Sequence, residues 1–236
     1  MTLGTSTQAY GEPSYWDKRY SKDSTPFDWY QKYPALAPLF QLYLLHRHRV
    51  LLVGCGNSTL GEDMVKDGYQ DVVNIDISSV VIEAMGKKYK DYPQLKYIEM
   101  DVRDMSAFES DSFDAVIDKG TLDSLMCGPN ASQNANKMLE EIGRILRSGG
   151  IFMLISYGAP NYRLSLLREP CLWEIKLHVV GKLGSQMEPQ KWELTVPIPL
   201  NEDSSSVTAI LGENPDVHYI YVCIKDESLR LESKEA

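Results

Sequence analysis

Apolar and polar residues alternate along this 236-residue chain in short runs, each typical of a buried strand or an amphipathic helix. Ser78 and Ser79 supply an N-cap for one predicted helix, and Gly149 and Gly150 supply a C-cap turn after another. This rhythm predicts an α/β fold, a doubly wound and mostly parallel sheet covered by helices on both faces. Strands are expected over 50–54, 71–76, 95–99, 113–118 and 150–156, and helices over 34–46, 58–68, 79–90 and 132–147.

The last third of the chain follows a different pattern. Residues 173–180 and 217–225 are predicted strands, and a long polar segment, 184–215, separates them. A structureless connection of that length is uncommon in a compact domain, so we expect it to contain a short strand at 192–198 or to be a functional loop. We predict one domain over 1–236, divided into a flexible lead (1–12), an aromatic-rich segment (13–48), a core (49–225) and a frayed tail (226–236).

Composition narrows the class of protein. Hydrophobic residues make up 43% and charged residues 24% of the chain, values ordinary for a soluble globular protein. No apolar run approaches the ~18 to 20 residues that span a bilayer, and the N-terminal residues lack a secretory pattern, so we expect no membrane association and a cytoplasmic location. The net charge of −9 disfavours a nucleic-acid partner; it suits a basic protein partner or serves solubility alone.

The cysteines and histidines predict no metal centre. The four cysteines are scattered without a C-x-x-C pair, which excludes the usual zinc and disulfide frameworks. The pair His46 and His48 stands next to two arginines, as at a solvated helix end. We therefore expect the chemistry of this protein to come from an organic ligand.

A glycine turn indicates which ligand. The first strand runs into Gly54 and Gly56, and the next strand ends on Asp76. Glycines let the backbone approach a ligand closely, and the acid accepts hydrogen bonds from ribose hydroxyls, which suits an adenosine-type molecule. A dinucleotide site needs a third glycine, yet position 59 is Thr and the next glycine is Gly61. The turn therefore favours S-adenosylmethionine, which has no phosphate, over a nicotinamide dinucleotide.

Further polar residues follow the third and fourth predicted strands. Asp101 can accept from an adenine amino group or cap a turn, while Val102 offers an apolar wall. The fourth strand ends in the run Asp-Lys-Gly-Thr-Leu-Asp over 118–123, at the carboxyl edge where open α/β sheets bind ligands. Lys119 is unexpected beside a cationic ligand unless an acid pairs with it or it donates through its backbone, and Asp114 and Asp118 are the candidate partners.

Aromatic residues cluster in the otherwise polar first part of the segment 13–48. Trp16, Tyr20 and Trp29 can present ring faces to a cationic sulfonium, an attraction of about 0.5–2 kcal/mol each. Alternatively, the three rings cover an edge of the core.

The combined motifs resemble the class I, seven-stranded S-adenosylmethionine-dependent methyltransferases. The motif order Y-W-D-x-R-Y, F-D-W-Y, L-V-G-C-G-N-S, N-I-D-I-S, M-D-V-R and D-K-G-T-L-D is similar to the lysine methyltransferases of elongation factor 1-alpha. The resemblance implies an antiparallel last strand, a monomer, a protein substrate and S-adenosylhomocysteine as product. It implies cofactor contacts from Trp16, Tyr20, Trp29, Gly54, Gly56, Asp76, Ile77, Asp101, Val102 and Lys119.

The acceptor sets a further requirement, because a lysine amine must be neutral to accept a methyl group. From a pKa of ~10.4, neutrality at pH 7 costs about 4.6 kcal/mol. Asp118, Asp123 and Glu83 are therefore candidates to attract the ammonium and accept its proton, with Asp118 and Asp123 the predicted catalytic pair. Three alternatives stay open: a small-molecule methyltransferase, a cofactor-binding protein without turnover and, more distantly, a nicotinamide oxidoreductase.

Overall fold

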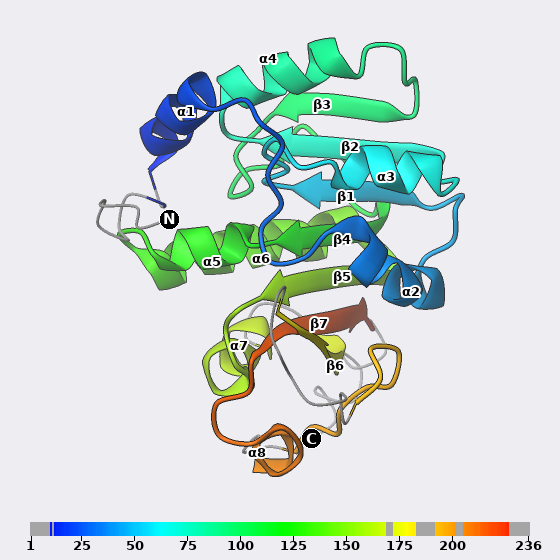
Figure 1. Ribbon diagram of the computed structural model, residues 1–236, viewed down its shortest axis with the longest axis vertical. Helices are drawn as coiled ribbons and strands as arrows, with labels where there is room; N and C mark the ends of the chain where they lie inside the picture. Colours follow the sequence, from blue (N-terminus) through cyan, green and yellow to red (C-terminus); the bar gives the residue numbers. More distant parts are fainter. Residues whose placement is uncertain (1–9, 11, 169–171, 183–191, 202–204, 227–236) are drawn as a thin grey trace.

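The computed structural model describes residues 10, 12–168, 172–182, 192–201 and 205–226. Within them one sheet of seven strands has the order β3-β2-β1-β4-β5-β7-β6, with helices on both faces (Figure 1). Every pair from β3 through β5 is parallel, and β7 runs antiparallel to both β5 and β6. The strands are β1 (Arg49–Val53), β2 (Asp71–Asp76), β3 (Leu95–Glu99), β4 (Phe113–Lys119), β5 (Leu146–Ser156), β6 (Trp173–Gly181) and β7 (Val217–Lys225).

This arrangement confirms the predicted α/β fold, including the antiparallel last strand. The predicted lead and tail lie outside the described residues, except for residues 10, 12 and 226, and so do 184–191 and 202–204 of the segment 184–215. None of the helices in the described part of the chain has the length and hydropathy of a membrane-spanning segment.

The central strands are apolar on both faces because helices cover both. In β1, Leu51 and Val53 join one buried cluster, while Val50 and Leu52 join the other. The first cluster includes α6, α7 and α8, and the second includes α2, α3 and α4. The helices are α1 (Pro13–Lys22), α2 (Tyr33–Tyr43), α3 (Leu60–Lys66), α4 (Ser79–Lys88), α5 (Thr121–Met126), α6 (Ala131–Ile145), α7 (Pro160–Arg168) and α8 (Ser205–Leu211).

The predicted C-cap turn at Gly149 and Gly150 is wrong. Helix α6 ends at Ile145, and Leu146 already pairs with Phe113 in β4, whereas the next pair joins Ala115 to Ile151. The intervening residues of β5 therefore form an irregularity inside the strand. Complete burial of the Leu146 side chain in the core explains why the strand begins before the glycines.

The structure also corrects the reading of the last third. The predicted strand at 192–198 is reduced to one isolated bridge, in which Ile198 pairs with Leu177 of β6. Helices α1, α5, α7 and α8 were not expected from the pattern; each has ten residues or fewer.

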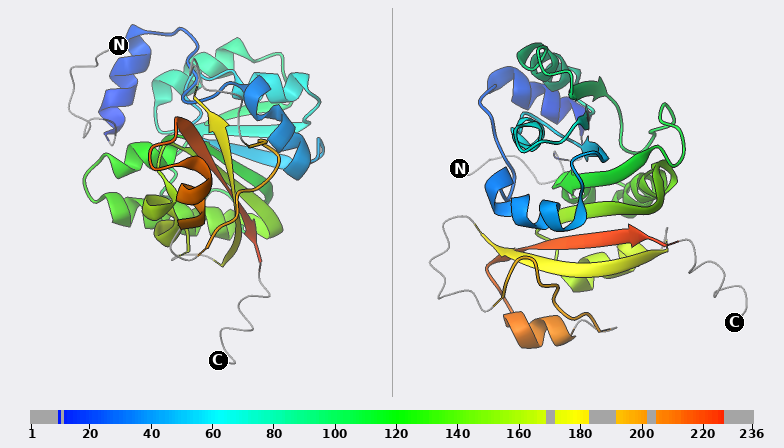
Figure 2. Two further views of the ribbon diagram at one scale, coloured as in Figure 1. Left: turned by 60° about the horizontal axis from the view of Figure 1, so that its bottom comes forward. Right: turned by 90° about the vertical axis from the view of Figure 1, so that its right-hand side faces the viewer.

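The parallel strands bring their carboxyl ends to a single edge of the sheet. The chain moves outward from β1 to β2 and β3, then returns to the other side of β1 as β4, which makes a topological switch point between β1 and β4. Helix α1 lies beside this edge, and the segment from α1 to α2 crosses in front of it (Figures 1 and 2). Ligands of open α/β sheets bind at such a point.

Candidate active site

A cavity opens at the switch point, with about 1100 Å³ of empty space that includes solvent-open volume. Its walls come from the glycine turn, the ends of β2 and β4, the loop after β3 and the aromatic segment that contains α1. The structure thus places every predicted cofactor-site residue on one cavity: Trp16, Tyr20, Trp29, Gly54, Gly56, Asp76, Ile77, Asp101, Val102 and Lys119.

The turn after β1 requires glycine at two positions. Gly54 and Gly56 have φ values of 57° and 52°, in the left-handed region that side chains rarely adopt. A Cβ on Gly54 would collide with the side chain of Thr121, whose hydroxyl donates to the Val53 carbonyl at 2.9 Å. A Cβ on Gly56 would lie 2.6 Å from the Tyr20 hydroxyl oxygen. The turn therefore packs directly against α5 on one side and α1 on the other.

Asp76 is held with its carboxylate next to this turn. One oxygen accepts from the Gly56 N–H at 2.9 Å, and the other accepts from the Ser78 N–H at 3.0 Å. The residue is 6% exposed, and burial raises the pKa of its carboxyl to about 6. At neutral pH the group is therefore ionised, and each oxygen keeps a lone pair for a hydroxyl in the cavity.

Asp101 lies at the cavity wall and also caps a turn, the second of the roles expected from its position. It lines the cavity, and it also caps the turn after β3 by accepting from the Arg103 N–H at 2.9 Å. The Arg103 guanidinium binds both carboxylate oxygens, with its shortest contact at 2.6 Å. A bidentate pair of this kind fixes the orientation of the acid at the cavity wall.

Trp16, Tyr20 and Trp29 line the cavity, and Tyr20 also packs against the buried cluster beneath α2, α3 and α4. Helix α1 has no fully buried residue. Trp16 stacks on Tyr20 with 6.0 Å between ring centroids, and Trp29 meets Trp16 edge to face at 6.5 Å. The guanidinium of Arg19 lies 5.2 Å from the Phe27 ring and 6.0 Å from the Trp29 ring.

Sequence reasoning missed Arg19, although it stands inside the Y-W-D-x-R-Y motif between two of the predicted rings. It lines the cavity, and among the described residues no carboxylate forms an ion pair with it. The signal was available, because a cation inside an aromatic cluster needs an anion or a ring beside it.

Lys119 pairs with an acid that the sequence reasoning did not consider. Its ammonium lies 2.9 Å from Asp28 and donates to the Trp29 carbonyl at 3.1 Å, and Asp28 also accepts from the Ser58 hydroxyl. Both charged side chains are buried, at 7% and 6% exposure, and burial lowers the pKa of Lys119. This pair holds the aromatic segment against the end of β4.

The expected partners of Lys119 are engaged elsewhere. Asp114 lies 2.6 Å from Arg147 in an ion pair and accepts from the Arg49 N–H at 2.6 Å. Asp118 turns its carboxylate toward α5. The expectation that either acid pairs with Lys119 is therefore wrong.

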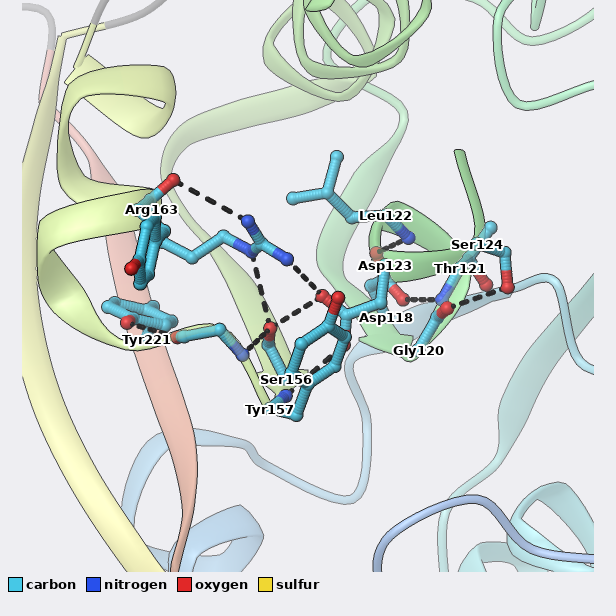
Figure 3. A network of polar contacts seen from close by, with 12 residues as sticks. Asp118, Gly120, Thr121, Leu122, Asp123, Ser124, Ser156, Tyr157, Arg163 and Tyr221 are labelled. Atoms are coloured by element: carbon cyan, nitrogen blue, oxygen red, sulfur yellow. Dashed lines mark hydrogen bonds and ion pairs between the residues drawn. The ribbon is translucent and has the colours of Figure 1, made fainter. Parts of the chain in front are cut away.

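The predicted catalytic acids, Asp118 and Asp123, are absent from the cavity lining. Both are held by polar contacts within the protein (Figure 3). Asp118 is fully buried and accepts from the N–H groups of Thr121 and Leu122 at 2.7 and 2.9 Å, which caps the start of α5. Burial raises the pKa of its carboxyl to about 7. These contacts assign Asp118 to shaping the loop after β4, and they offer no support for direct contact with substrate.

Asp123 occupies a neighbouring network. It is 3% exposed and accepts from Tyr30, Ser156, Arg163 and the Tyr157 N–H. Sequence reasoning missed these partners, which come from the aromatic-rich segment, from β5 and the residue after it, and from α7. The third candidate, Glu83, is wrong: its side chain is 69% exposed on α4 and pairs with Lys87.

Comparison with known proteins shows a similarity to methyltransferases. Residues 51–154 match a family model described as "Methyltransferase domain". The structure resembles a SAM-dependent methyltransferase from Methanosarcina mazei, with a TM-score of 0.51, 16% identity, and coverage of 80% of this chain and 97% of the other. Residues 51–154 are therefore similar to a methyltransferase domain, and the seven-stranded sheet shares its fold with a solved methyltransferase.

Two similar proteins narrow the resemblance. The chain is 34% identical over 204 residues to "eEF1A lysine and N-terminal methyltransferase" of Bos taurus, covering 83% of this chain and 29% of that protein. It is 37% identical over 164 residues to "EEF1A lysine methyltransferase 4" of Bos taurus, covering 65% of this chain and 64% of that protein. The chain thus spans less than two thirds of either relative, and it is similar to the eEF1A lysine methyltransferases over most of its own length.

Proposed function

We propose that this protein transfers a methyl group from S-adenosylmethionine to a lysine side chain of a protein, such as translation elongation factor 1-alpha. The observation that carries the proposal is the single cavity on which every predicted cofactor-site residue meets. The names of the similar proteins supply the acceptor class.

The cavity fits the cofactor chemically. Asp76 offers carboxylate lone pairs for ribose hydroxyls, Asp101 offers an acceptor for an adenine amino group, and Val102 offers an apolar wall. Arg19 offers a cation for the amino-acid carboxylate. When bound, S-adenosylmethionine supplies a methyl group on a cationic sulfur.

The remaining cavity residues orient the cofactor and enclose it. Trp16, Tyr20 and Trp29 present ring faces that attract a cation by about 0.5–2 kcal/mol each and exclude water from it. The buried Lys119–Asp28 pair fixes the segment that carries these rings. Methyl transfer is a displacement that gains mainly from such positioning.

The setting of the reaction is part of the same proposal. An enzyme acting on a translation factor works in the cytoplasm, and the net charge of −9 suits a basic protein surface better than nucleic acid. We further propose that the protein acts as a monomer, as one domain divided at residues 12, 48 and 225.

The test uses purified protein, methyl-labelled S-adenosylmethionine and purified elongation factor 1-alpha, with mass spectrometry to locate the label. We expect label on a lysine, lost with Asp76→Asn and kept with Glu140→Gln, which removes an exposed carboxylate of α6. A parallel reaction with cell lysate separates the alternatives. Label confined to small molecules would indicate a different acceptor class, and tight S-adenosylhomocysteine binding without any transfer would indicate a binding protein; either result overturns the proposal.

A further inference from the structure

Tyr30 has a backbone conformation that its residue type disfavours. Its φ is 62°, and a bulky side chain in the left-handed region costs of order 1–3 kcal/mol. It follows Trp29 directly, and its ring edge would lie 3.2 Å from a Cβ on Gly120, so both its chain neighbour and its packing partner line the cavity. The ring also lies 4.7 Å from that of His218 in β7. Such strain persists only where surrounding contacts fix it, and it clusters at functional sites.

The main contact that fixes Tyr30 is a hydrogen bond from its hydroxyl to Asp123, 2.7 Å long. The acid has no capacity left for a substrate. One of its oxygens accepts from Ser156 at 2.6 Å and Arg163 at 2.7 Å, and the other accepts from Tyr30 and from the Tyr157 N–H at 3.2 Å. Four donors fill the four lone-pair sites of a carboxylate.

The charge of Asp123 is also compensated. Its partner Arg163 is 5% exposed in the ion pair, so both charges are buried together (Figure 3). An uncompensated carboxylate would hold a nearby amine in its charged form, whereas a neutral pair does so much less. The network therefore suits an acceptor that must be a neutral amine.

The Tyr30 hydroxyl oxygen has only one role left. Burial, together with the nearby Asp123 charge, raises the pKa of Tyr30, so the phenol keeps its proton. That proton is already donated to Asp123. The oxygen can consequently bind a further group only by accepting a hydrogen bond, and the partner must carry an N–H or O–H.

Tyr30 lies close both to an exposed residue and to the wall of the cavity. Tyr30 is half-buried, and the Tyr157 ring, 6.5 Å away, is 54% exposed. The cavity lies on the other side, through Trp29 and Gly120. Tyr30 does not itself line the cavity, but its neighbours include two residues of the cavity wall, Trp29 and Gly120, and the exposed ring of Tyr157.

We propose that Tyr30 receives the acceptor amine, its hydroxyl oxygen accepting a hydrogen bond from the nitrogen to be methylated, while Asp123, Arg163 and Ser156 are positioning residues for that hydroxyl. The inference rests on the proposed function and deepens it, because it identifies the acceptor as a hydrogen-bond donor.

The test compares Tyr30→Phe with Tyr33→Phe, using purified elongation factor 1-alpha as acceptor. The control is closely matched, since Tyr33 also donates to a carboxylate, that of Asp67 at 2.5 Å, but lies on α2 away from the cavity. We expect Tyr30→Phe to lower kcat about tenfold or more, while S-adenosylhomocysteine affinity in calorimetry stays within about twofold of the wild type. Tyr33→Phe should change neither.

A second variant, Asp123→Asn, keeps the side-chain shape and tests the positioning role. It should lower kcat without changing the KM for the cofactor, which a purely structural effect would not achieve. The proposal is overturned if Tyr30→Phe behaves like Tyr33→Phe, or if it loses cofactor affinity in parallel with activity. A wild-type protein that binds S-adenosylhomocysteine but methylates no lysine would instead refute the proposed function, and the inference with it.

Discussion

Asp76 affects both the stability of this protein and its proposed cofactor site. The variant Asp76→Asn should change the pH dependence of stability and the cofactor affinity in opposite directions. The carboxyl is 6% exposed with a pKa raised from 3.8 to about 6, chiefly by burial. The folded state therefore binds the proton more tightly than the unfolded state does. The stabilisation by the protonated form is complete below about pH 4 and is lost as the pH rises through about 6.

The magnitude follows from the shift. A difference of about 2.2 pKa units at 1.36 kcal/mol each gives roughly 3 kcal/mol between pH 4 and pH 7. Asparagine does not titrate, so the unfolding free energy of the variant should rise relative to the wild type by about that amount over this interval. Cofactor affinity should change in the opposite sense. Loss of a charged acceptor for ribose hydroxyls weakens binding by about 1.5–3 kcal/mol.

The assay measures urea unfolding of both proteins at several pH values, and S-adenosylhomocysteine binding by calorimetry at pH 7. Glu140→Gln serves as the control, because its exposed carboxylate should leave both quantities unchanged. Stability curves that stay parallel from pH 4 to pH 7 would refute the argument from burial. Unchanged affinity would remove Asp76 from the site.

Three further predictions concern the cavity walls. Lys119→Met leaves the buried Asp28 carboxylate without its cation and should lower the unfolding free energy by about 3–5 kcal/mol. Adding Asp28→Asn should restore part of that stability. An equal loss of stability in the single and the double variant would contradict this. Gly54→Ala should lower the unfolding free energy measured in urea by more than about 1 kcal/mol, because Gly54 has a positive φ. Gly86→Ala, on the open surface of α4, should stabilise the protein slightly. Equal effects of the two substitutions would refute the argument from the turn. Arg19→Ala should weaken S-adenosylhomocysteine binding about tenfold at unchanged melting temperature, and full affinity would exclude it as a carboxylate partner.

The sequence predicted the central strands well because their signal is local. An apolar run such as Val50 to Val53 is typical of a strand buried on both faces, and its alternation with predicted helices favours a parallel sheet. Helices α1, α5 and α7 carry no comparable signal. They are short, and α1 buries no residue completely, so their existence depends on docking to the sheet edge.

The cofactor-site residues were predictable for a related reason. The glycine turn and Asp76 stand at strand ends, and parallel strands deliver their ends to the same edge. The partners of the charged groups were not predictable in this way. Lys119 forms its ion pair with Asp28, 91 residues away, and not with Asp118, its neighbour in the sequence.

By itself, then, the sequence determined the sheet, the glycine turn and the chemical types gathered at one edge, since periodicity and residue conformation are properties of short segments. Only the tertiary structure decided that Asp118 caps a helix and that Arg163 and Tyr30 both engage Asp123. The reason is physical: the energy of a polar pair depends on distance and burial, and both exist only once remote segments have packed together.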